Sequence, residues 1–431
     1  MLSKKFTKEE TSWIMYDWAN GAFTTIMIAA VFPAYFVGIT YGDTLGSMWW
    51  AIGLIIARVT VGILAPFIGA FIEYKGYKKK LFVIFLSLGL IATAYTAFVD
   101  SWQLLLIGYV IANIFWSACN QIYDAFLPDI TTKNNMDKVS TTGFAYGYIG
   151  GSTIPFVGSI ILIMFGNIIG INATMAVRIS IIITALWWGI FSIPFILNVH
   201  HKYEKEMPKK GAITQTFKRM IKTAKEITGN KGLLYFMIAY FFYIDGVGTI
   251  INLATAFGAE IGLDTTSMMG ALIITQLVAF PFSLLFGKLS KKVGNINLII
   301  YSILLYIIIS VVGFTMGFGL ETNLFDVDTA LILFWILAFL VGTVQGGIQA
   351  ISRSTYGKLI PADKSGDFFG FYEIFGRFAA ILGPAVYAIT LDITGRPSFS
   401  ILSVIIVFVI GLVTLLIGKK HIMAILSIGL T

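Results

Sequence analysis

The chain has 431 residues, of which 57% are hydrophobic and only 12% are charged, whereas soluble domains carry roughly a quarter charged residues. A water-soluble fold cannot hide so much apolar surface, so an ordinary soluble protein is excluded. The net charge of +8 does not indicate nucleic-acid binding, because the basic residues gather in loops between apolar runs. We therefore expect a lipid bilayer to surround most of the chain.

Apolar stretches recur along the whole length, and each can cross a hydrocarbon core of about 30 Å at 1.5 Å per residue. They predict an all-α membrane protein with twelve transmembrane helices in two pseudo-symmetric halves, 1–197 and 232–431, joined by a cytoplasmic linker, 198–231. Residues 1–10 lack the pattern of a removable signal peptide, so the first span is expected to remain as an anchor. The predicted spans are 13–39, 47–72, 81–99, 102–127, 141–166, 171–197, 232–257, 266–287, 296–318, 329–351, 367–390 and 398–418.

Lysine and arginine alternate sharply between successive loops, and these residues retain a loop on the cytoplasmic side. The basic loops begin with Lys4 and end with Lys420, whereas the opposite loops contain Arg396 alone. Both termini are therefore expected in the cytoplasm, and in a prokaryote the membrane would be the cell membrane. The linker reads as a solvated tether beside anionic lipid, with a basic surface helix near 213–227 and no specific packing.

Two similar loops indicate an internal duplication. Gly69 and Gly76 follow the second predicted span, and Gly287 and Gly294 follow the eighth. Each pair is offset by 218 residues, 287 minus 69 and 294 minus 76, which is close to half the chain. Duplicated parallel halves around a midplane site are an architecture of secondary transporters.

The first of these loops resembles the cytoplasmic loop motif of the major facilitator superfamily, with Gly69, Glu73, Gly76 and Lys78 at the matching positions. The resemblance implies a gating role. Glycine permits a sharp turn and close helix approach, and the Glu73 carboxylate would meet the positive end of a neighbouring helix. The second loop has Lys291 where the acid belongs, so its gating function is in doubt.

A closer resemblance, to the vacuole-effluxer-like branch of that superfamily, covers most of the chain. It implies a transporter related to amino-acid effluxers. Asp124 and Arg353 lie in the matching motifs, and we include them among the candidate gating residues. Asp124 stands where this branch usually has asparagine. The resemblance is carried by the segments 13–23, 32–36, 123–129, 147–151, 243–249 and 349–354.

Ionisable side chains inside a bilayer are the best candidates for a binding site, because each costs about 2.5–3.5 kcal/mol at a helix centre and so faces the interior. Asp245 lies near the middle of the seventh predicted span, with Tyr243 and Thr249 nearby. We expect it to bind the solute or a proton; half of a structural ion pair, with Arg58 or Arg178, is the alternative.

Asp17 and Asn20 form a second candidate pair, one helical turn apart in the first span. Solvation of Asp17 at the membrane interface is the alternative reading. Arg58 and Arg178 lie in the outer halves of their spans, where each either grips a solute carboxylate in two hydrogen bonds or extends outward to the interface.

Several other classes of function lack their signature. The sequence has no phosphate-binding loop, no metal-binding cysteine or histidine motif, no histidine within a span and one cysteine, Cys119. We therefore predict no cofactor, no metal and no enzyme activity. The expected function is proton-coupled transport of a small organic solute, amino acids included, by a monomer; a non-transporting receptor or scaffold and a lipid flippase are the alternatives.

The topology gives a first prediction. Reporter fusions at Lys80 and Lys225 should be cytoplasmic and a fusion at Asp326 external, because inverting the chain would move nearly all basic loops across the membrane. Reporter activity in whole cells measures this, and an external Lys225 fusion would overturn the assignment.

Overall fold

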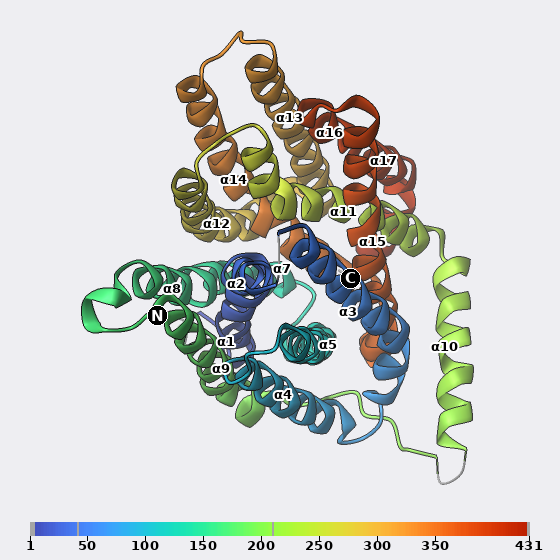
Figure 1. The fold of residues 1–431 in the computed structure, drawn as a ribbon. Helices are drawn as coiled ribbons and strands as arrows, with labels where there is room; N and C mark the ends of the chain where they lie inside the picture. Colours follow the sequence, from blue (N-terminus) through green and yellow to red (C-terminus); the bar gives the residue numbers. More distant parts are fainter. Residues whose placement is uncertain (1–4, 41–42, 209–210, 429–431) are drawn as a thin grey trace. The chain divides into compact units, whose positions relative to one another are not determined.

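The computed structural model describes residues 5–40, 43–208 and 211–428. Within these ranges every regular element is a helix (Figure 1). Three lysines of the predicted basic segments lie outside the described residues, namely Lys4, Lys209 and Lys210.

Among the described residues, twelve helical segments are long and apolar enough to cross a membrane, which confirms the predicted number of spans and the all-α class. Helices suit this solvent because their backbone groups are hydrogen-bonded within the segment. Several ends extend past the apolar pattern; the tenth span ends at Leu359 rather than at residue 351, because helical hydrogen bonding continues where the side chains become polar.

The helices up to the linker form the first six spans, and the first and fifth of these contain π-helical turns. In chain order they are α1 (Lys8–Phe23), η2 (Thr24–Ala29), α2 (Val31–Ile39), α3 (Asp43–Phe71), α4 (Tyr77–Thr96), α5 (Trp102–Ala125), α6 (Leu127–Ile130), α7 (Met136–Tyr146), η3 (Gly147–Thr153), α8 (Ile154–Phe165), η4 (Gly166–Ile169) and α9 (Ala173–Asn198).

The linker contains one long helix, and six further spans follow it. These elements are α10 (Ala212–Gly229), α11 (Lys231–Glu260), α12 (Thr265–Val293), α13 (Asn295–Glu321), α14 (Val327–Leu359), η5 (Ala362–Lys364), α15 (Ser365–Thr394), α16 (Pro397–Ser403) and α17 (Ile405–Ile428).

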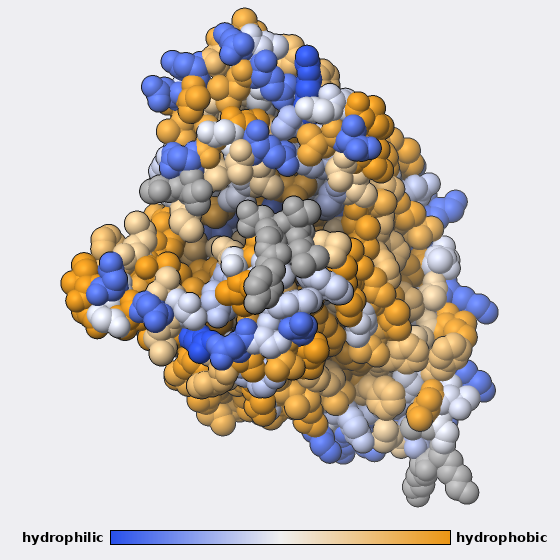
Figure 2. Space-filling model, in the orientation of Figure 1, coloured by the Kyte–Doolittle hydropathy of each residue, from blue (hydrophilic) through white to orange (hydrophobic). Residues whose placement is uncertain are grey.

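Large apolar side chains are exposed on many of these helices, and Figure 2 shows apolar residues over much of the visible face. Examples are Ile63 on α3, Ile91 on α4 and Leu186 on α9, each more than half exposed. Exposure on this scale would make a soluble protein aggregate, and it is the surface expected of helices that contact lipid.

The chain forms two compact units, Met1–Thr223 with Ile360–Ile374, and Ala224–Leu359 with Phe375–Thr431. Two of the three boundaries between these units fall inside helices, α10 and α15, and the third follows the end of α14. The first ten residues of α15 therefore pack with the N-terminal spans, although they belong to the eleventh span. This placement determines the site described below.

In the first unit α1 packs closely on η3 through glycine. A β-carbon at Gly151 would lie 2.7 Å from the Gly21 Cα atom, and one at Gly21 would lie 2.7 Å from the Gly147 carbonyl oxygen. The indole of Trp13 stacks on Tyr123 at 4.2 Å between ring centres and donates a hydrogen bond to the Tyr123 carbonyl at 2.9 Å. Small residues allow the close approach of the α1 and η3 backbones, and π-turns are frequent at functional sites.

The α1–η3 contact leads to a stability prediction. Gly151→Ala should lower the free energy of unfolding by about 1–3 kcal/mol, because the added methyl meets backbone atoms that cannot move aside. Thermal unfolding of the purified protein in detergent measures the effect. Gly158→Ala, in the same span but with open space at the β-carbon, is the control, and equal behaviour of the two variants would show that the contact is loose.

Candidate functional site

The loop between α3 and α4 turns sharply at a glycine, as the sequence predicted. Gly76 has φ of 76°, and Gly294 in the second copy has φ of 84°, a region that favours glycine. Gly69 lies against the start of α15, where a β-carbon would come within 3.0 Å of the Gly370 Cα atom. Lys291 in the second copy is exposed, so that loop does not reproduce the buried acid of the first.

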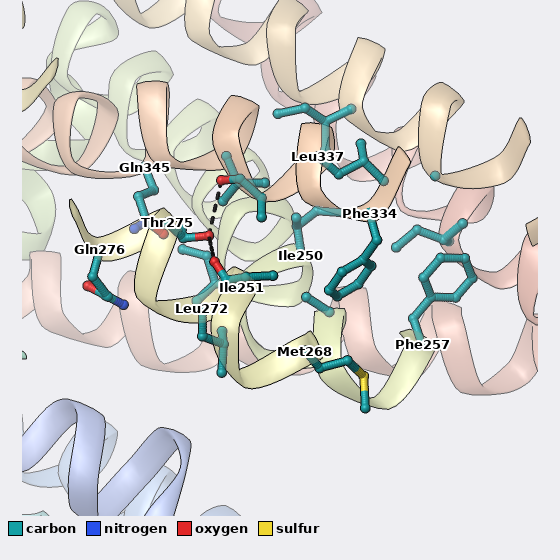
Figure 3. A pocket seen from close by; sticks show the side chains of 17 residues that line it. Ile250, Ile251, Phe257, Met268, Leu272, Thr275, Gln276, Phe334, Leu337 and Gln345 are labelled. Carbon is teal, nitrogen blue, oxygen red and sulfur yellow. Dashed lines mark hydrogen bonds between the residues drawn. The ribbon is translucent and has the colours of Figure 1, made fainter. Parts of the chain in front are cut away.

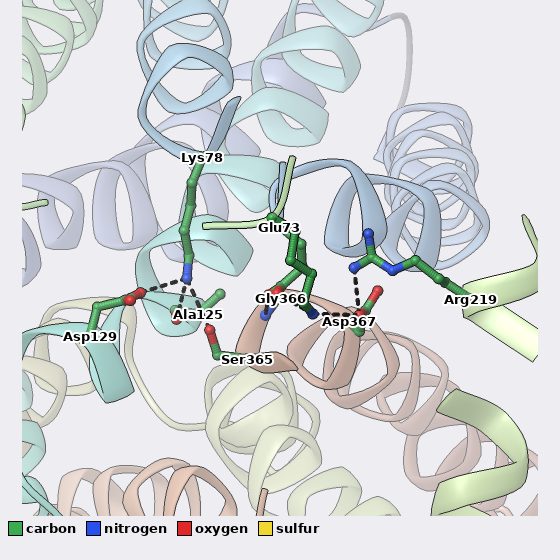
Figure 4. A network of polar contacts seen from close by, with 9 residues as sticks. Glu73, Lys78, Ala125, Asp129, Arg219, Ser365, Gly366 and Asp367 are labelled. Atoms are coloured by element: carbon green, nitrogen blue, oxygen red, sulfur yellow. Dashed lines mark hydrogen bonds and ion pairs between the residues drawn. The ribbon is translucent and has the colours of Figure 1, made fainter. Parts of the chain in front are cut away.

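Glu73 is fully buried and holds the first turn of α15 (Figure 4). Its Oε1 atom accepts a hydrogen bond from the Gly366 backbone N–H at 2.6 Å, which confirms the expected contact with a helix end. Its Oε2 atom accepts from the Lys205 ammonium group at 2.9 Å. Burial raises the pKa of the Glu73 carboxyl, whereas the positive charges of Lys78 and Lys205 oppose that shift.

Lys78 forms the second buried element of this network. Its ammonium nitrogen lies 2.6 Å from the Asp129 Oδ2 atom, with both side chains fully buried. It also donates to the Ala125 carbonyl and to the Ser365 hydroxyl, each at 2.9 Å. All three ammonium protons therefore have an acceptor, which is the condition for a buried charge to be tolerated.

The linker takes part in the network, so the expectation of a tether without packing is wrong. The Lys205 N–H donates to the Glu73 carbonyl, and the Lys75 N–H donates to the Lys205 carbonyl, both at 2.9 Å. The Lys202 N–H donates to the Asp129 Oδ1 atom at 3.0 Å. The sequence pattern missed this packing because the positive charges, which suit anionic lipid, here neutralise buried carboxylates instead.

Helix α10 is the amphipathic surface helix predicted near 213–227, and it adds a further ion pair. Its Arg219 guanidinium lies 2.6 Å from the Asp367 Oδ2 atom in the first turn of α15, and Lys205 lies 3.8 Å from the same oxygen. The guanidinium also lies 5.2 Å from the centre of the Tyr74 ring. Glu73 and Asp367 thus share the Lys205 ammonium group, and Asp367 also pairs with Arg219.

The predicted pair Asp17 and Asn20 does come together in the first unit. The Asn20 amide donates to the Tyr16 carbonyl at 3.2 Å and lies 3.5 Å from the Asp17 Oδ1 atom. The Asp17 carboxylate lies against Gly143 of α7, where a β-carbon would overlap it. This cluster therefore sits beside the glycine-rich α7–η3 segment.

Asp245 lies midway along α11 in the second unit and is 1% exposed. A β-carbon at Gly383 would come within 3.0 Å of its Oδ2 atom, close to Pro384 and to the kink of α15 at Ala380. The hydroxyl groups of Tyr243 and Thr249, its neighbours in sequence, form hydrogen bonds with groups other than the Asp245 carboxylate. Tyr243 bonds the Ser352 hydroxyl at 2.7 Å.

Thr249 donates to the Asp245 backbone carbonyl at 2.7 Å. The two predicted arginines belong to the first unit, whereas Asp245 belongs to the second. Arg178 belongs to the first unit and forms an ion pair with Asp100, which is 88% exposed, and Arg58 is half-buried on α3 of the same unit.

The two remaining gating candidates have different surroundings. Asp124 is half-buried at the end of α5, and the loop lysine Lys78 pairs with Asp129 instead. Arg353 is 4% exposed near the end of α14, in the second unit.

Four charged residues of the network were missed by the sequence reasoning: Asp129, Lys205, Arg219 and Asp367. Asp129 ends the segment 123–129, and an acid in the first turn of a helix, such as Asp367, is favoured by the helix dipole, so these two carried a usable signal. Lys205 and Arg219 carried none, because their partners are distant in sequence.

Among the described residues no group of three or more potential metal ligands occurs.

Comparison with known families identifies the chain. The family model for Atg22-like vacuole effluxers matches residues 54–421. The chain belongs to this family. YxiO of Bacillus subtilis, an uncharacterized transporter of the major facilitator type, is 42% identical over 425 residues, or 96% of this chain and 95% of YxiO. Autophagy-related protein 22-2 of Aspergillus clavatus is 26% identical over 296 residues, which span 62% of this chain but only 46% of the fungal protein.

Solved structures of major facilitator transporters share the fold of this chain. The proton:xylose symporter XylE aligns with a TM-score of 0.71 at 12% identity, over 97% of this chain and 96% of XylE. The human organic anion transporter MFSD10 aligns with a TM-score of 0.65 at 15% identity, over 95% and 99% of the two chains. The predicted major facilitator fold is thus confirmed. Family membership and the 42% identity to YxiO identify the chain as a transporter of the major facilitator type.

The buried pair of Lys78 and Asp129 gives a prediction. Lys78→Met should lower the free energy of unfolding by about 3–5 kcal/mol, because it leaves a buried carboxylate without its cation. The double variant Lys78→Met with Asp129→Asn should recover part of that loss, and thermal unfolding of the four proteins in detergent measures the coupling.

Lys80→Met is the matched control, because Lys80 is exposed on the same helix and surface changes shift stability by about 0.5 kcal/mol or less. If the Lys78 variant behaved like the Lys80 variant, the buried pair would contribute nothing.

Proposed function

We propose that this protein moves a small organic solute across the cell membrane by alternating access, coupled to a proton gradient. Membership of the Atg22-like family and the major facilitator fold support transport as the general activity. The proton as coupling ion and the solute class go beyond those findings and depend on particular residues.

Asp245 carries the proposal of proton coupling. A carboxylate midway along a membrane-spanning helix and 1% exposed is expensive as an anion unless it is paired or hydrated. Protonation removes that cost during part of the cycle. The carboxylate also packs where α15 is kinked at Ala380, so a change in its charge acts at a point where a helix already bends.

The Glu73 network is the proposed gate. Glu73 and Asp367 bind Lys205 and Arg219 at the first turn of α15, and this helix begins in one compact unit and continues in the other. Any movement of α15 away from the α3–α4 loop must break these ion pairs together with the Gly366 hydrogen bond. The network therefore favours the state in which they are intact.

Amino acids are the proposed solutes, exported by a monomer with both termini in the cytoplasm. The family description as vacuole effluxers supports export, and the resemblance of segments such as 123–129 to amino-acid effluxers supports the solute class. Flux into proteoliposomes separates a transporter from a scaffold, which moves nothing, and a water-soluble solute separates it from a lipid flippase.

Asp245→Asn tests the coupling. In proteoliposomes given radiolabelled amino acids outside, the variant should lose accumulation driven by a pH gradient. It should retain counterflow exchange with unlabelled amino acids loaded inside, because exchange needs no net proton movement. Asp392→Asn is the control, because it removes an exposed carboxylate from α15.

Wild-type accumulation by a well-folded Asp245→Asn variant would remove Asp245 from the mechanism and make Asp17 the next candidate. A different outcome is that the variant unfolds and that replacing Arg58 or Arg178 by an uncharged residue restores its stability. In that outcome Asp245 is half of a structural ion pair.

A further inference from the structure

The second unit contains a cavity whose lining does not include Asp245. Its volume is about 80 Å³, several times the roughly 10–15 Å³ that one water molecule needs. No charged side chain lines it. The lining residues are Ile250, Ile251, Ala254 and Phe257 of α11, Met268, Ala271, Leu272, Thr275 and Gln276 of α12, Ile309 and Gly313 of α13, Phe334, Leu337, Ala338, Val341 and Gln345 of α14, and Ile401 of α16.

The cavity has a polar end and an apolar end (Figure 3). Gln345, Thr275 and Gln276 gather at one end, whereas Phe334 and Met268 lie toward the other. The polar end is held together by the Thr275 hydroxyl, which contacts the Ala271 carbonyl of its own helix at 2.9 Å and the Ala338 carbonyl of α14 at 3.0 Å. The hydroxyl is therefore already engaged, and α12 and α14 are fixed close together.

Two amide atoms at this end are buried without a hydrogen-bond partner among the described residues. They are the Gln345 nitrogen, Nε2, and the Gln276 oxygen, Oε1, and Gln345 is 2% exposed. Leaving such an atom unsatisfied costs about 1–3 kcal/mol, so a buried donor and a buried acceptor beside a cavity call for an explanation. A ligand that supplies both partners provides one.

We propose that this cavity binds the uncharged part of the transported solute, a compact apolar body that ends in a hydroxyl or primary amide. Such a group can accept from Gln345 Nε2 and donate to Gln276 Oε1 at the same time. A carboxylate can only accept and an ammonium can only donate, and either would bring an uncompensated charge into an uncharged cavity. The role of the ligand as solute rests on the proposed transport function, whereas its binding does not.

Thermal unfolding of the full-length protein in detergent, titrated with isocaproamide, tests the proposal. The amide should stabilise the protein, and its acid analogue isocaproate should bind at least tenfold more weakly. Gln345→Leu and Gln276→Leu should each weaken isocaproamide binding by about tenfold. Gln349→Leu should not, because Gln349 follows one turn later on α14 and does not line the cavity.

The ligand-free proteins report on folding, because Gln345→Leu removes an unsatisfied buried group and should unfold no earlier than the wild type. If it does unfold early, the comparison of amide with acid on the wild type still decides. Equal binding of isocaproamide, isocaproate and the hydrocarbon isohexane, unchanged in the glutamine variants, would identify a cleft for lipid tails and overturn the proposal. If isocaproamide does not bind although proton-driven flux is intact, the proposed ligand site is wrong and the transport function stands. If isocaproamide binds but no flux is measured, the transport function is wrong and the ligand site stands.

Discussion

A buried charge must have a counter-charge beside it, and this constraint organises the part of the first unit where α3, α5, the linker and the start of α15 meet. Glu73, Lys78 and Asp129 are fully buried there or nearly so, in surroundings where one unpaired ion would cost several kcal/mol. The chain meets the cost by gathering partners from distant segments, namely the α3–α4 loop, the end of α5, the linker and the first turn of α15. Their common electrostatic need, more than apolar packing, brings these segments to one place.

Much of the fold could be predicted because the bilayer allows few solutions. Apolar runs had to be helices, and the distribution of lysine and arginine and the spacing of Gly69, Glu73 and Gly76 indicated the loop that meets a helix end. The partners of Glu73 in that contact could not be predicted in this way. Gly366 lies 293 residues from Glu73 and Lys205 lies 132 residues away, and no local pattern encodes a pairing at such separations. The linker was misjudged for the same reason, since basic residues look alike whether they face lipid or a buried carboxylate.

The duplication of the loop has not kept its two copies equivalent. Both glycines after the loop have positive φ, but ψ is −13° at Gly76 and 148° at Gly294, so the backbone turns differently in the two copies. Glu73 is buried, whereas its counterpart Lys291 is exposed. A positive φ needs only a glycine at one position, whereas the buried network needs several residues to change together. A glycine with positive φ is therefore common to both copies, whereas the buried acid and its ion pairs are found in the first.

Arg219 and Lys205 approach the same Asp367 oxygen from points 14 residues apart in the linker. The linker is therefore anchored to Asp367 at both of these residues. Extra residues placed there would enlarge a surface loop at little entropic cost, but removing residues would pull one cation off its carboxylate. Natural variation in linker length, and the choice of where to join a reporter domain or an affinity tag, should therefore be asymmetric: insertions are tolerated between these anchors, and deletions are not.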